Sequence, residues 1–300
     1  MTIHSAAVLE LVQEAKISDL LGLDRCNRFE ASGVYMKDGT LHIIFDNLSH
    51  VMLIKPDWVQ AGAGPILQVL YGSGTQGYED ITFRTDIKHW YCLIEAERDR
   101  SGVYKPYVDE FDESFVFIAR HPLDFSFVDD KKGFEGLATL HDRGHDYLLG
   151  LNEDDQSEGG KFGRGWGSGR IQVFEEDQGR WKHIGTVRLP EIVQFADYSS
   201  LDFQAPYMTV LSQESSAMWV GRVRADAPDF DHFFEDEGRQ YSFPLDYKGR
   251  RVYWNLEGIA WIGEGRLAVV SDKKKPNHPG RGEVKDQSVH ILKLVDEEQV

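Results

Sequence analysis

The sequence predicts an all-β fold, a five-bladed β-propeller whose blades are four-stranded antiparallel sheets. The first observation behind this prediction is a repeat. Five times, a short apolar strand with a Ser or Glu at its second position leads through a turn into another apolar strand. Those second positions are Ser32, Glu79, Glu135, Ser199 and Glu257, and they follow one another at about 47, 56, 64 and 58 residues. Repeats of this length built from hairpins are typical of propellers with one blade per repeat.

The second observation is the composition, which is that of a globular protein. Of the 300 residues, 41% are hydrophobic and 12% are aromatic, which is ample for a large core. A chain of this length could form two domains. Because similar units occur along its whole length, we expect one propeller domain over residues 1–300.

The first blade is expected at about 31–72 and the second at about 78–128. In the first blade, Asp38-Gly39 between two apolar runs is a strong hairpin signal. The apolar runs 51–54 and 66–70 supply its outer strands. In the second blade, strands at 78–83 and 90–95 precede a long polar connection, and 115–119 is expected as the third strand.

The remaining blades are expected at about 134–190, 198–245 and 256–295. Pro206 falls in a turn of the fourth blade, where it interrupts no inner strand. The N-terminal segment 7–13 is expected to pair with segment 289–294 and to close the ring, because that pairing removes two sheet edges at once.

Propeller geometry places the five second positions together. The first strand of each blade lies nearest the axis, and the second strand returns to the face where the first began. The ends of the second strands should therefore lie near the same face; they are Asp46, Glu95, Asn152, Ser212 and Asp272. Connections at about 96–113, 153–169 and 273–287 should open over this face, and loops of that length are usually functional or disordered.

Three carboxylates and two hydroxyls would thus point into one narrow channel. Carboxylates that lie so close together repel one another, so they need a bound cation or the protonation of some of them. A set of oxygen ligands without His or Cys suits Ca²⁺, while Mg²⁺ fits less well because it demands stricter octahedral geometry. The alternative is that the Glu side chains cap backbone groups of neighbouring inner strands around a water-filled channel.

The order Ser, Glu, Glu, Ser, Glu, with the contexts Tyr198-Ser199-Ser200-Leu201 and Leu256-Glu257-Gly258-Ile259, resembles the calcium-activated nucleotidases, the soluble apyrase family. That resemblance implies a five-bladed propeller with an axial calcium ion that hydrolyses nucleoside di- and triphosphates. It also implies that the calcium ligands are Ser32, Glu79, Glu135, Ser199 and Glu257. The Glu-Gly-Ile and Glu-Gly-Leu units are similar to phytase-like and esterase-like propellers as well.

Basic residues in the connections over this face could hold a small anionic substrate such as a phosphate ester or anhydride, because phosphate needs fixed donors and positive charge. The candidates for substrate binding are Arg98, Lys161, Arg164, Lys273 and Lys274. Glu95 and Asp272 are the candidate catalytic residues, as general bases or as ligands of a second ion, with Asp154 as a further possibility. The alternative is that these are charged loop residues exposed to solvent without a binding role, since acidic residues are interleaved with the basic ones.

The sequence thus favours a calcium-binding propeller acting as a metal-dependent phosphohydrolase. The alternative is a non-catalytic binding propeller with a structural axial calcium ion. A third hypothesis is a carbohydrate-acting propeller, which would need two carboxylic acids at a set separation.

The charge pattern limits the partners. The formal net charge is −17, so nucleic acid and anionic membranes are poor partners. No apolar run approaches a membrane span, and the first residues lack a signal-peptide pattern. Together with only two cysteines, Cys26 and Cys92, these features lead us to expect a cytoplasmic protein. The oligomeric state is left open.

Overall fold

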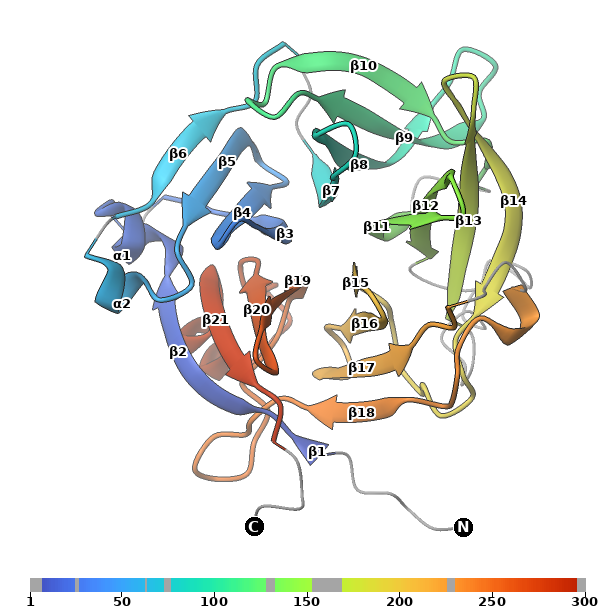
Figure 1. Ribbon diagram of the computed structural model, residues 1–300. Coiled ribbons are helices and arrows are strands. Elements are labelled where there is room, and N and C mark those ends of the chain that lie inside the picture. The colour runs from blue at the N-terminus through green and yellow to red at the C-terminus, as the bar shows by residue number, and fades with distance from the viewer. Residues whose placement is uncertain are drawn as a thin grey trace.

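The computed structural model describes residues 7–24, 27–62, 64–72, 77–127, 133–152, 169–225 and 230–295. Its strands form five sheets arranged as blades around a central axis, as Figure 1 shows. In each blade the strands are hydrogen-bonded mainly in sequence order, and the first of them lies nearest the axis. The expected five-bladed, all-β fold is therefore confirmed.

The first two blades follow the chain directly. Blade one consists of β3 (Ala31–Lys37), β4 (Thr40–Phe45), β5 (Leu48–Ile54) and β6 (Ile66–Val69). Blade two consists of β7 (Tyr78–Arg84), β8 (His89–Arg98), β9 (Tyr104–Phe111) and β10 (Phe117–Pro122). The turn between β3 and β4 has Asp38 and Gly39 at positive φ, 48° and 72°, as a tight hairpin of the expected kind requires.

The expected long connection at 96–113 is wrong. β8 continues to Arg98 and pairs with β9, so the segment that we expected as the third strand is the fourth, β10. The reason is a buried carboxylate that makes β9 look like a loop in sequence. Asp109 is fully buried and accepts hydrogen bonds from Arg120 Nε at 2.7 Å and from the Tyr78 hydroxyl at 2.7 Å. A partnered carboxylate of this kind can lie in a sheet interior.

Blades three and four lie on the opposite side of the ring from blade one (Figure 1). Blade three consists of β11 (Phe134–Asp142), β12 (His145–Asn152), β13 (Arg170–Asp177) and β14 (Arg180–Arg188). Blade four consists of β15 (Ser200–Gln204), β16 (Tyr207–Ser212), β17 (Ala217–Arg222) and β18 (Arg239–Ser242). Both follow the expected strand order.

The N-terminal segment closes the ring, but it divides between two blades. Blade five consists of β19 (Leu256–Gly263), β20 (Arg266–Ser271), β21 (Ser288–Lys293) and, as its outermost strand, β2 (Glu10–Lys16). The two residues of β1 (Ala7–Val8) instead pair in parallel with β18 at the rim of blade four. One short segment therefore covers the edges of two neighbouring sheets.

The helical segments are short. They are α1 (Ile17–Leu21), α2 (Trp58–Ala61), η3 (Phe230–His232) and η4 (Gly280–Val284). In the described part of the chain no helix is long and apolar enough to cross a membrane.

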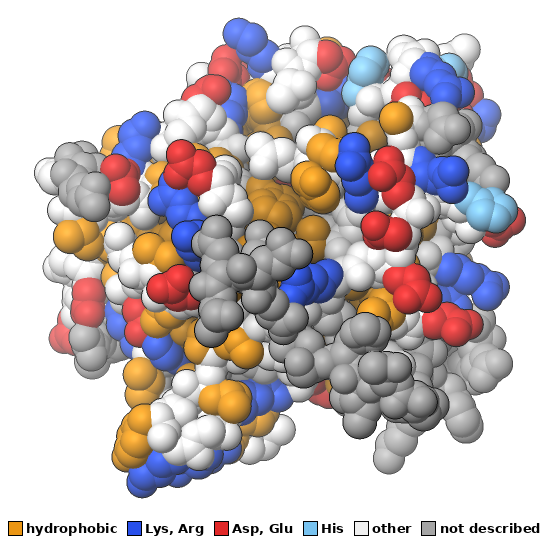
Figure 2. All heavy atoms as spheres, turned by 60° about the horizontal axis from the view of Figure 1, so that its bottom comes forward, with side chains coloured by type: hydrophobic (Ala, Val, Ile, Leu, Met, Phe, Trp, Pro, Cys, Tyr) orange, Lys and Arg blue, Asp and Glu red, His pale blue; other side chains and the backbone are white. Residues whose placement is uncertain are grey.

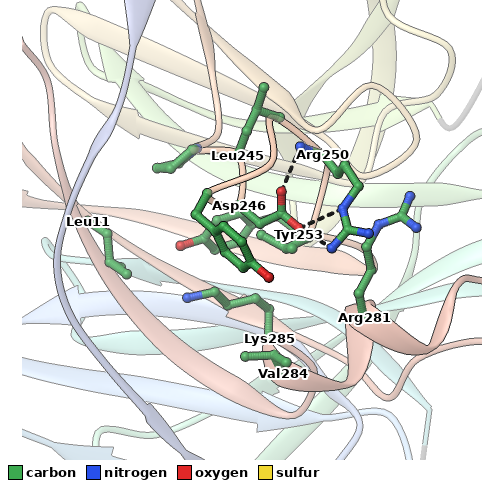
Figure 3. A pocket seen from close by; sticks show the side chains of 11 residues that line it. Leu11, Leu245, Asp246, Arg250, Tyr253, Arg281, Val284 and Lys285 are labelled. Atoms are coloured by element: carbon green, nitrogen blue, oxygen red, sulfur yellow. Dashed lines mark hydrogen bonds and ion pairs between the residues drawn. The ribbon is translucent and has the colours of Figure 1, made fainter.

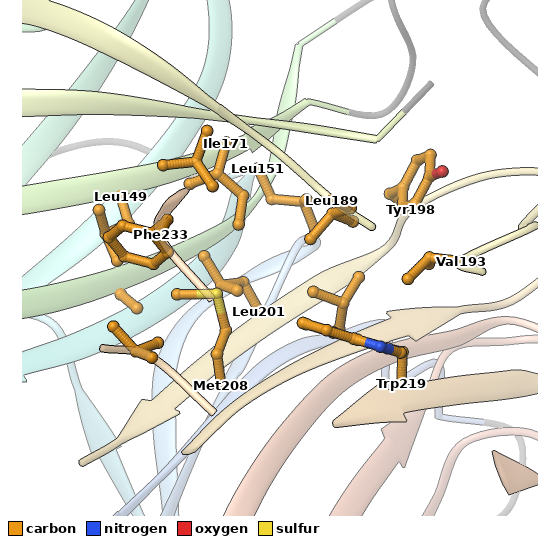
Figure 4. Packing of buried hydrophobic residues seen from close by; sticks show 14 of the residues in the cluster. Leu149, Leu151, Ile171, Leu189, Val193, Tyr198, Leu201, Met208, Trp219 and Phe233 are labelled. Carbon is orange, nitrogen blue, oxygen red and sulfur yellow. The ribbon is translucent and has the colours of Figure 1, made fainter. Parts of the chain in front are cut away.

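The hydrophobic core lies between the faces of adjacent blades. Figure 4 shows the cluster between blades three and four, where Leu149 and Ile171 from one blade lie across from Met208 and Trp219 of the other. All four side chains are fully buried. The Trp219 indole donates to the Glu237 carbonyl at 2.8 Å, so its polar atom is satisfied. Contacts of this kind fix the angle between blades and hence the position of the inner strands.

Candidate active site at the propeller axis

The inner strands approach one another most closely at one layer, which we call the axial belt. It consists of the residue after each repeated second position, namely Gly33, Asp80, Gly136, Ser200 and Gly258. A Cβ added at Gly33 would lie 2.8 Å from the Asp80 Cα, and one at Gly136 would lie 2.7 Å from the Leu201 nitrogen. A Cβ at Gly258 would lie 3.0 Å from the Gly33 Cα. Neighbouring blades therefore meet backbone to backbone here, and only Gly allows that approach.

Asp80 ties three inner strands together in this belt. Its side chain is 1% exposed. It accepts hydrogen bonds from Ile81 N at 2.8 Å in its own blade and from Leu137 N at 2.9 Å in blade three. The backbone of Leu201 in blade four also hydrogen-bonds to it. Burial nevertheless raises the pKa of Asp80 well above its ordinary value, because hydrogen bonds from three neutral N–H groups stabilise the carboxylate less than water does.

The junction between blades four and five is made in the same way. The Ser200 hydroxyl accepts from Ile259 N at 3.2 Å, and the Asp202 carboxylate accepts from Trp261 N at 2.7 Å. Burial raises the pKa of Asp202 to about 6. Asp80 and Asp202 thus cap backbone N–H groups of neighbouring inner strands, which is the role that the sequence offered as an alternative for the repeated Glu residues.

The repeated second positions lie one residue earlier and form the layer that we call the axial mouth. This layer also includes Asp46 and Asp272, which directly follow β4 and β20, and Glu95, which lies within β8. Four of the five second positions lie in a β-bulge of their inner strand. Ser32, Glu135 and Glu257 are each the unpaired residue between two residues that pair with consecutive residues of the neighbouring strand. Glu79 lies in the bulge between Tyr78 and Ile81. A bulge re-aims side chains and is frequent beside active sites. Blade four has no such shift in its inner pair.

The two Ser residues join inner strands. The Ser32 hydroxyl donates to the Tyr78 carbonyl at 2.5 Å, and the Ser199 hydroxyl donates to the Leu256 carbonyl at 2.7 Å. Each of these bonds crosses from one blade to the next. The hydroxyl protons are therefore committed to the fold, and only the oxygen lone pairs of these residues remain for an ion.

Glu79 is surrounded by other acidic groups. Its pKa is raised well above the ordinary value, first by burial and then by the charges of Glu95, Asp46 and Glu257. Glu95 lies against the backbone of Gly133, where a Cβ would contact its side chain. The face that we expected to collect these groups therefore brings Glu95, Asp46 and Glu257 within electrostatic reach of Glu79.

Asp272 is a mouth carboxylate on which two basic groups act. Burial raises its pKa to about 6, and the charge of Asp46 adds to this, while Arg28 and Lys275 oppose it. Arg28 also lowers the pKa of Asp46, which burial raises. Sequence reasoning missed Arg28, because it precedes the first blade and belongs to no repeat. Asn152 and Ser212 instead form hydrogen bonds within the fold. The Asn152 side-chain oxygen accepts from Gln172 Nε2 at 2.9 Å, and the Ser212 hydroxyl donates to the Asp197 carboxylate at 2.5 Å.

The basic residues that were expected to hold a substrate are dispersed. The Lys274 ammonium donates to the carbonyls of Lys275 and His278, both at 3.3 Å, and pairs with Glu283 at 3.6 Å. Arg98 is exposed; it bonds to the Gly102 carbonyl and lies over the Tyr104 ring. The exposed Lys273 follows Asp272 directly. Lys161, Arg164 and Asp154 lie outside the described residues.

The donor chemistry of the mouth fits a hard divalent cation, because the charges of neighbouring carboxylates raise the pKa of Glu79 and the described side chains of the mouth offer oxygen donors. As the side chains stand, however, the described residues contain no group of three or more His, Cys, Asp or Glu arranged to hold a metal ion.

The fold defines the class of this protein, the β-propellers, and comparison with known proteins goes no further. No family model matches the chain, and neither does any curated protein. A GH43 β-xylosidase/α-arabinofuranosidase from a compost microbial metagenome, solved with xylotriose in a calcium-free form, is similar at TM-score 0.53 and 10% identity, covering 95% of this chain and 94% of that one.

Two other solved structures are similar at the same level. An α-L-arabinofuranosidase from Lactobacillus brevis has TM-score 0.52 and 13% identity, covering 90% of this chain and 93% of its own. The calcium-binding protein regucalcin from Agrobacterium tumefaciens has TM-score 0.50 and 10% identity, covering 96% of this chain and 95% of its own. At such identities the likeness shows the fold alone.

Proposed function

We propose that this protein is a calcium-dependent hydrolase of phosphate esters or phosphoanhydrides that acts at the axial mouth. The observation that carries the proposal is the surroundings of Glu79: this side chain is partly buried, and the charges of four other carboxylates, three of them in the mouth, act on it. A divalent cation would relieve this repulsion more completely than protons do at neutral pH. Calcium suits the oxygen donors and the adaptable spacing of the mouth better than magnesium does.

Two lines of likeness support the proposal. The Ser, Glu, Glu, Ser, Glu order resembles the calcium-activated nucleotidases, which supplies the reaction class. Among structures with a similar fold, regucalcin is described as calcium-binding. Neither line extends beyond fold and motif, so the proposal rests on the mouth itself.

The groups around Asp272 could carry out the chemistry. When bound, the ion would polarise a phosphoryl oxygen. With a pKa of about 6, Asp272 is mostly ionised at neutral pH and can accept a proton from a water molecule. Arg28 and Lys275, whose charges act on Asp272, would hold the remaining negative charge of the phosphate. Glu95, beside Glu79, would help to position the ion.

The proposal is tested first by thermal unfolding of chelator-stripped protein with and without Ca²⁺ or Mg²⁺. At a calcium concentration of 100 times Kd, mass action stabilises the folded state by about 2.7 kcal/mol. For a chain of this size we expect a rise in Tm of roughly 5 °C. Mg²⁺ should give a smaller rise, and the double variant Glu135→Gln/Glu257→Gln should give none.

The matched control is Glu10→Gln/Glu191→Gln, which removes the same charge from two exposed residues that do not belong to the mouth. It should respond to calcium as the unaltered protein does. If calcium leaves the Tm unchanged, or if the control loses the response together with the mouth variant, there is no axial calcium site.

The reaction is tested with calcium-loaded protein on nucleoside di- and triphosphates and on p-nitrophenyl phosphate. Asp272→Asn should lower kcat about 100-fold or more while the calcium-induced rise in Tm is retained, and Arg28→Gln should mainly raise KM. A calcium response without any hydrolysis would exclude the enzyme and leave the second candidate.

That second candidate is a non-catalytic binding propeller with a structural axial calcium ion. The observation that favours it is Lys274, whose ammonium is engaged within its own loop and not directed to an open site. A carbohydrate-acting propeller has weaker support, since the similar glycosidases share only the fold with this chain.

A further inference from the structure

A separate cavity of about 420 Å³ lies at the rim of the ring, outside the axial mouth. Three segments that are distant in sequence enclose it: β2, the connection between β18 and β19, and η4 with the residue that follows it (Figure 3). Its apolar wall includes Leu11, Leu245, Val252 and Val284. We call this cavity the rim pocket, and its size is that of a small-molecule site.

The charged side chains of the rim pocket are mostly basic, although the chain as a whole carries a formal charge of −17. Arg250, Arg281 and Lys285 line it, with Asp246 as the one carboxylate among the lining residues. Arg250 is paired with Asp246 at 2.7 Å, as the dashed lines of Figure 3 mark. Lys285 is paired with Glu14 at 2.5 Å. These two cations are therefore neutralised within the fold.

Arg281 is different. Its Nε donates to the Arg251 carbonyl at 2.9 Å, which fixes the direction of the guanidinium. Among the described residues it has no carboxylate partner. Its two terminal nitrogens are therefore available, and they present the planar pair of N–H donors that matches a carboxylate.

The apolar part of the rim pocket is open to solvent. Leu245 is 58% exposed, Val284 is 65% exposed and Tyr247, which also lines the pocket, is 90% exposed. Figure 2 shows hydrophobic and basic side chains side by side where the molecule projects at the lower left. Large exposed apolar side chains that gather at one concave place usually mark a binding site.

We propose that the rim pocket binds a small organic carboxylate with an apolar chain. The carboxylate pairs with Arg281, and the chain lies along Leu245, Val252 and Val284. A neutral apolar molecule would leave the guanidinium unpaired, and a short anion would leave the apolar wall in water. Because the site shares no residue with the axial mouth, it is independent of calcium and of hydrolysis.

The experiment is a calorimetric titration of the intact protein with octanoate, compared with octan-1-ol and with acetate. We expect saturable binding of octanoate at one site. Octan-1-ol, which lacks the charge, should bind at least about tenfold more weakly, because a hydrogen bond to a charged group contributes at least that factor. Acetate should also bind at least about tenfold more weakly, because it lacks the methylene groups that would cover the apolar wall. Prior removal of calcium should leave octanoate binding unchanged.

Two variants test the assigned contacts. Arg281→Gln should weaken octanoate binding about tenfold or more, and Leu245→Glu should do the same by placing a negative charge on an exposed wall residue without disturbing the core. Arg180→Gln, the same charge change at an exposed turn, is the control and should bind normally. Absence of saturable binding, or equal affinity in the unaltered protein and in both pocket variants, would overturn the proposal.

Discussion

The axial belt and the axial mouth are neighbours along every inner strand, yet their polar groups have different surroundings. In the belt, the Asp80 carboxylate accepts backbone hydrogen bonds from Ile81 and Leu137, at 2.8 and 2.9 Å. In the mouth, one residue earlier, the pKa of Glu79 is raised by burial and by the charges of Glu95 and Asp46. Asp80 of the belt is thus buried and faces backbone donors, whereas Glu79 of the mouth is partly buried and faces other carboxylates.

This difference indicates what each layer is for. A carboxylate that accepts backbone N–H groups from several blades holds the ring together. A group of carboxylates that face one another makes the fold less stable unless something positive joins them, and such arrangements gather at functional sites. In four of the five inner strands the mouth residue lies in a β-bulge, which re-aims its side chain, so neighbouring residues can serve the two purposes.

The largest effect is expected from Asp80→Ala. The substitution leaves the N–H groups of Ile81 and Leu137 buried without their acceptor, and each such group costs about 1–3 kcal/mol. We expect the free energy of unfolding to fall by about 3 kcal/mol or more in urea denaturation. Asp80→Asn retains one acceptor oxygen and should lose less. If Asp80→Ala unfolds like the unaltered protein, the belt does not hold the blades together.

A smaller loss is expected from Gly136→Ala. The new Cβ would lie 2.7 Å from the Leu201 nitrogen and 3.0 Å from the Ser200 carbonyl carbon, and these backbone atoms cannot move aside as a flexible side chain could. Overpacking of this kind costs about 1–3 kcal/mol in the free energy of unfolding. Gly280→Ala is the control, because no atom lies within 4 Å of the corresponding position. Equal denaturation curves for the two variants would mean that the inner strands can move apart freely.

The smallest effect has the opposite sign. Glu79→Gln should stabilise the calcium-free protein at pH 7 by about 1 kcal/mol, because it removes a charge that neighbouring carboxylates oppose. A carboxyl whose folded pKa is raised binds more protons in the folded state, so it makes stability fall as pH rises from the unfolded value near 4 towards the folded value. Asp272, with a pKa of about 6, acts in the same window.

The measurement is the free energy of unfolding between pH 4 and 7 without calcium, for the unaltered protein and for Glu79→Gln. The variant should lose less stability than the unaltered protein as the pH rises. Glu10→Gln, at an exposed position of β2, should follow the unaltered protein. If Glu79→Gln were instead destabilised at pH 7, as Asp80→Ala is expected to be, the distinction between the two layers would fail.

The sequence alone determined the number of blades, most strand positions and the closure of the ring. These features depend on local patterns, namely hairpins that recur along the chain with a Ser or Glu at a fixed position. It also indicated residues near the start of each inner strand and near the end of the second strands, because strand direction fixes the face on which they lie. In blade two the second strand continues past Glu95 to Arg98. It failed at β9, where a buried and partnered Asp109 made a strand resemble a loop.

Only the tertiary structure decided what those residues contact. The belt depends on bonds between strands some 57 residues apart, such as Asp80 to Leu137, and no local pattern encodes them. The bulges depend on the register against a partner strand, which periodicity within one strand does not contain. Arg28 and Arg281 acquire their roles from segments that the ring brings together. The repeat therefore specified the blades, while the distances across the axis and at the rim arose from closing the ring, because they join groups on different blades.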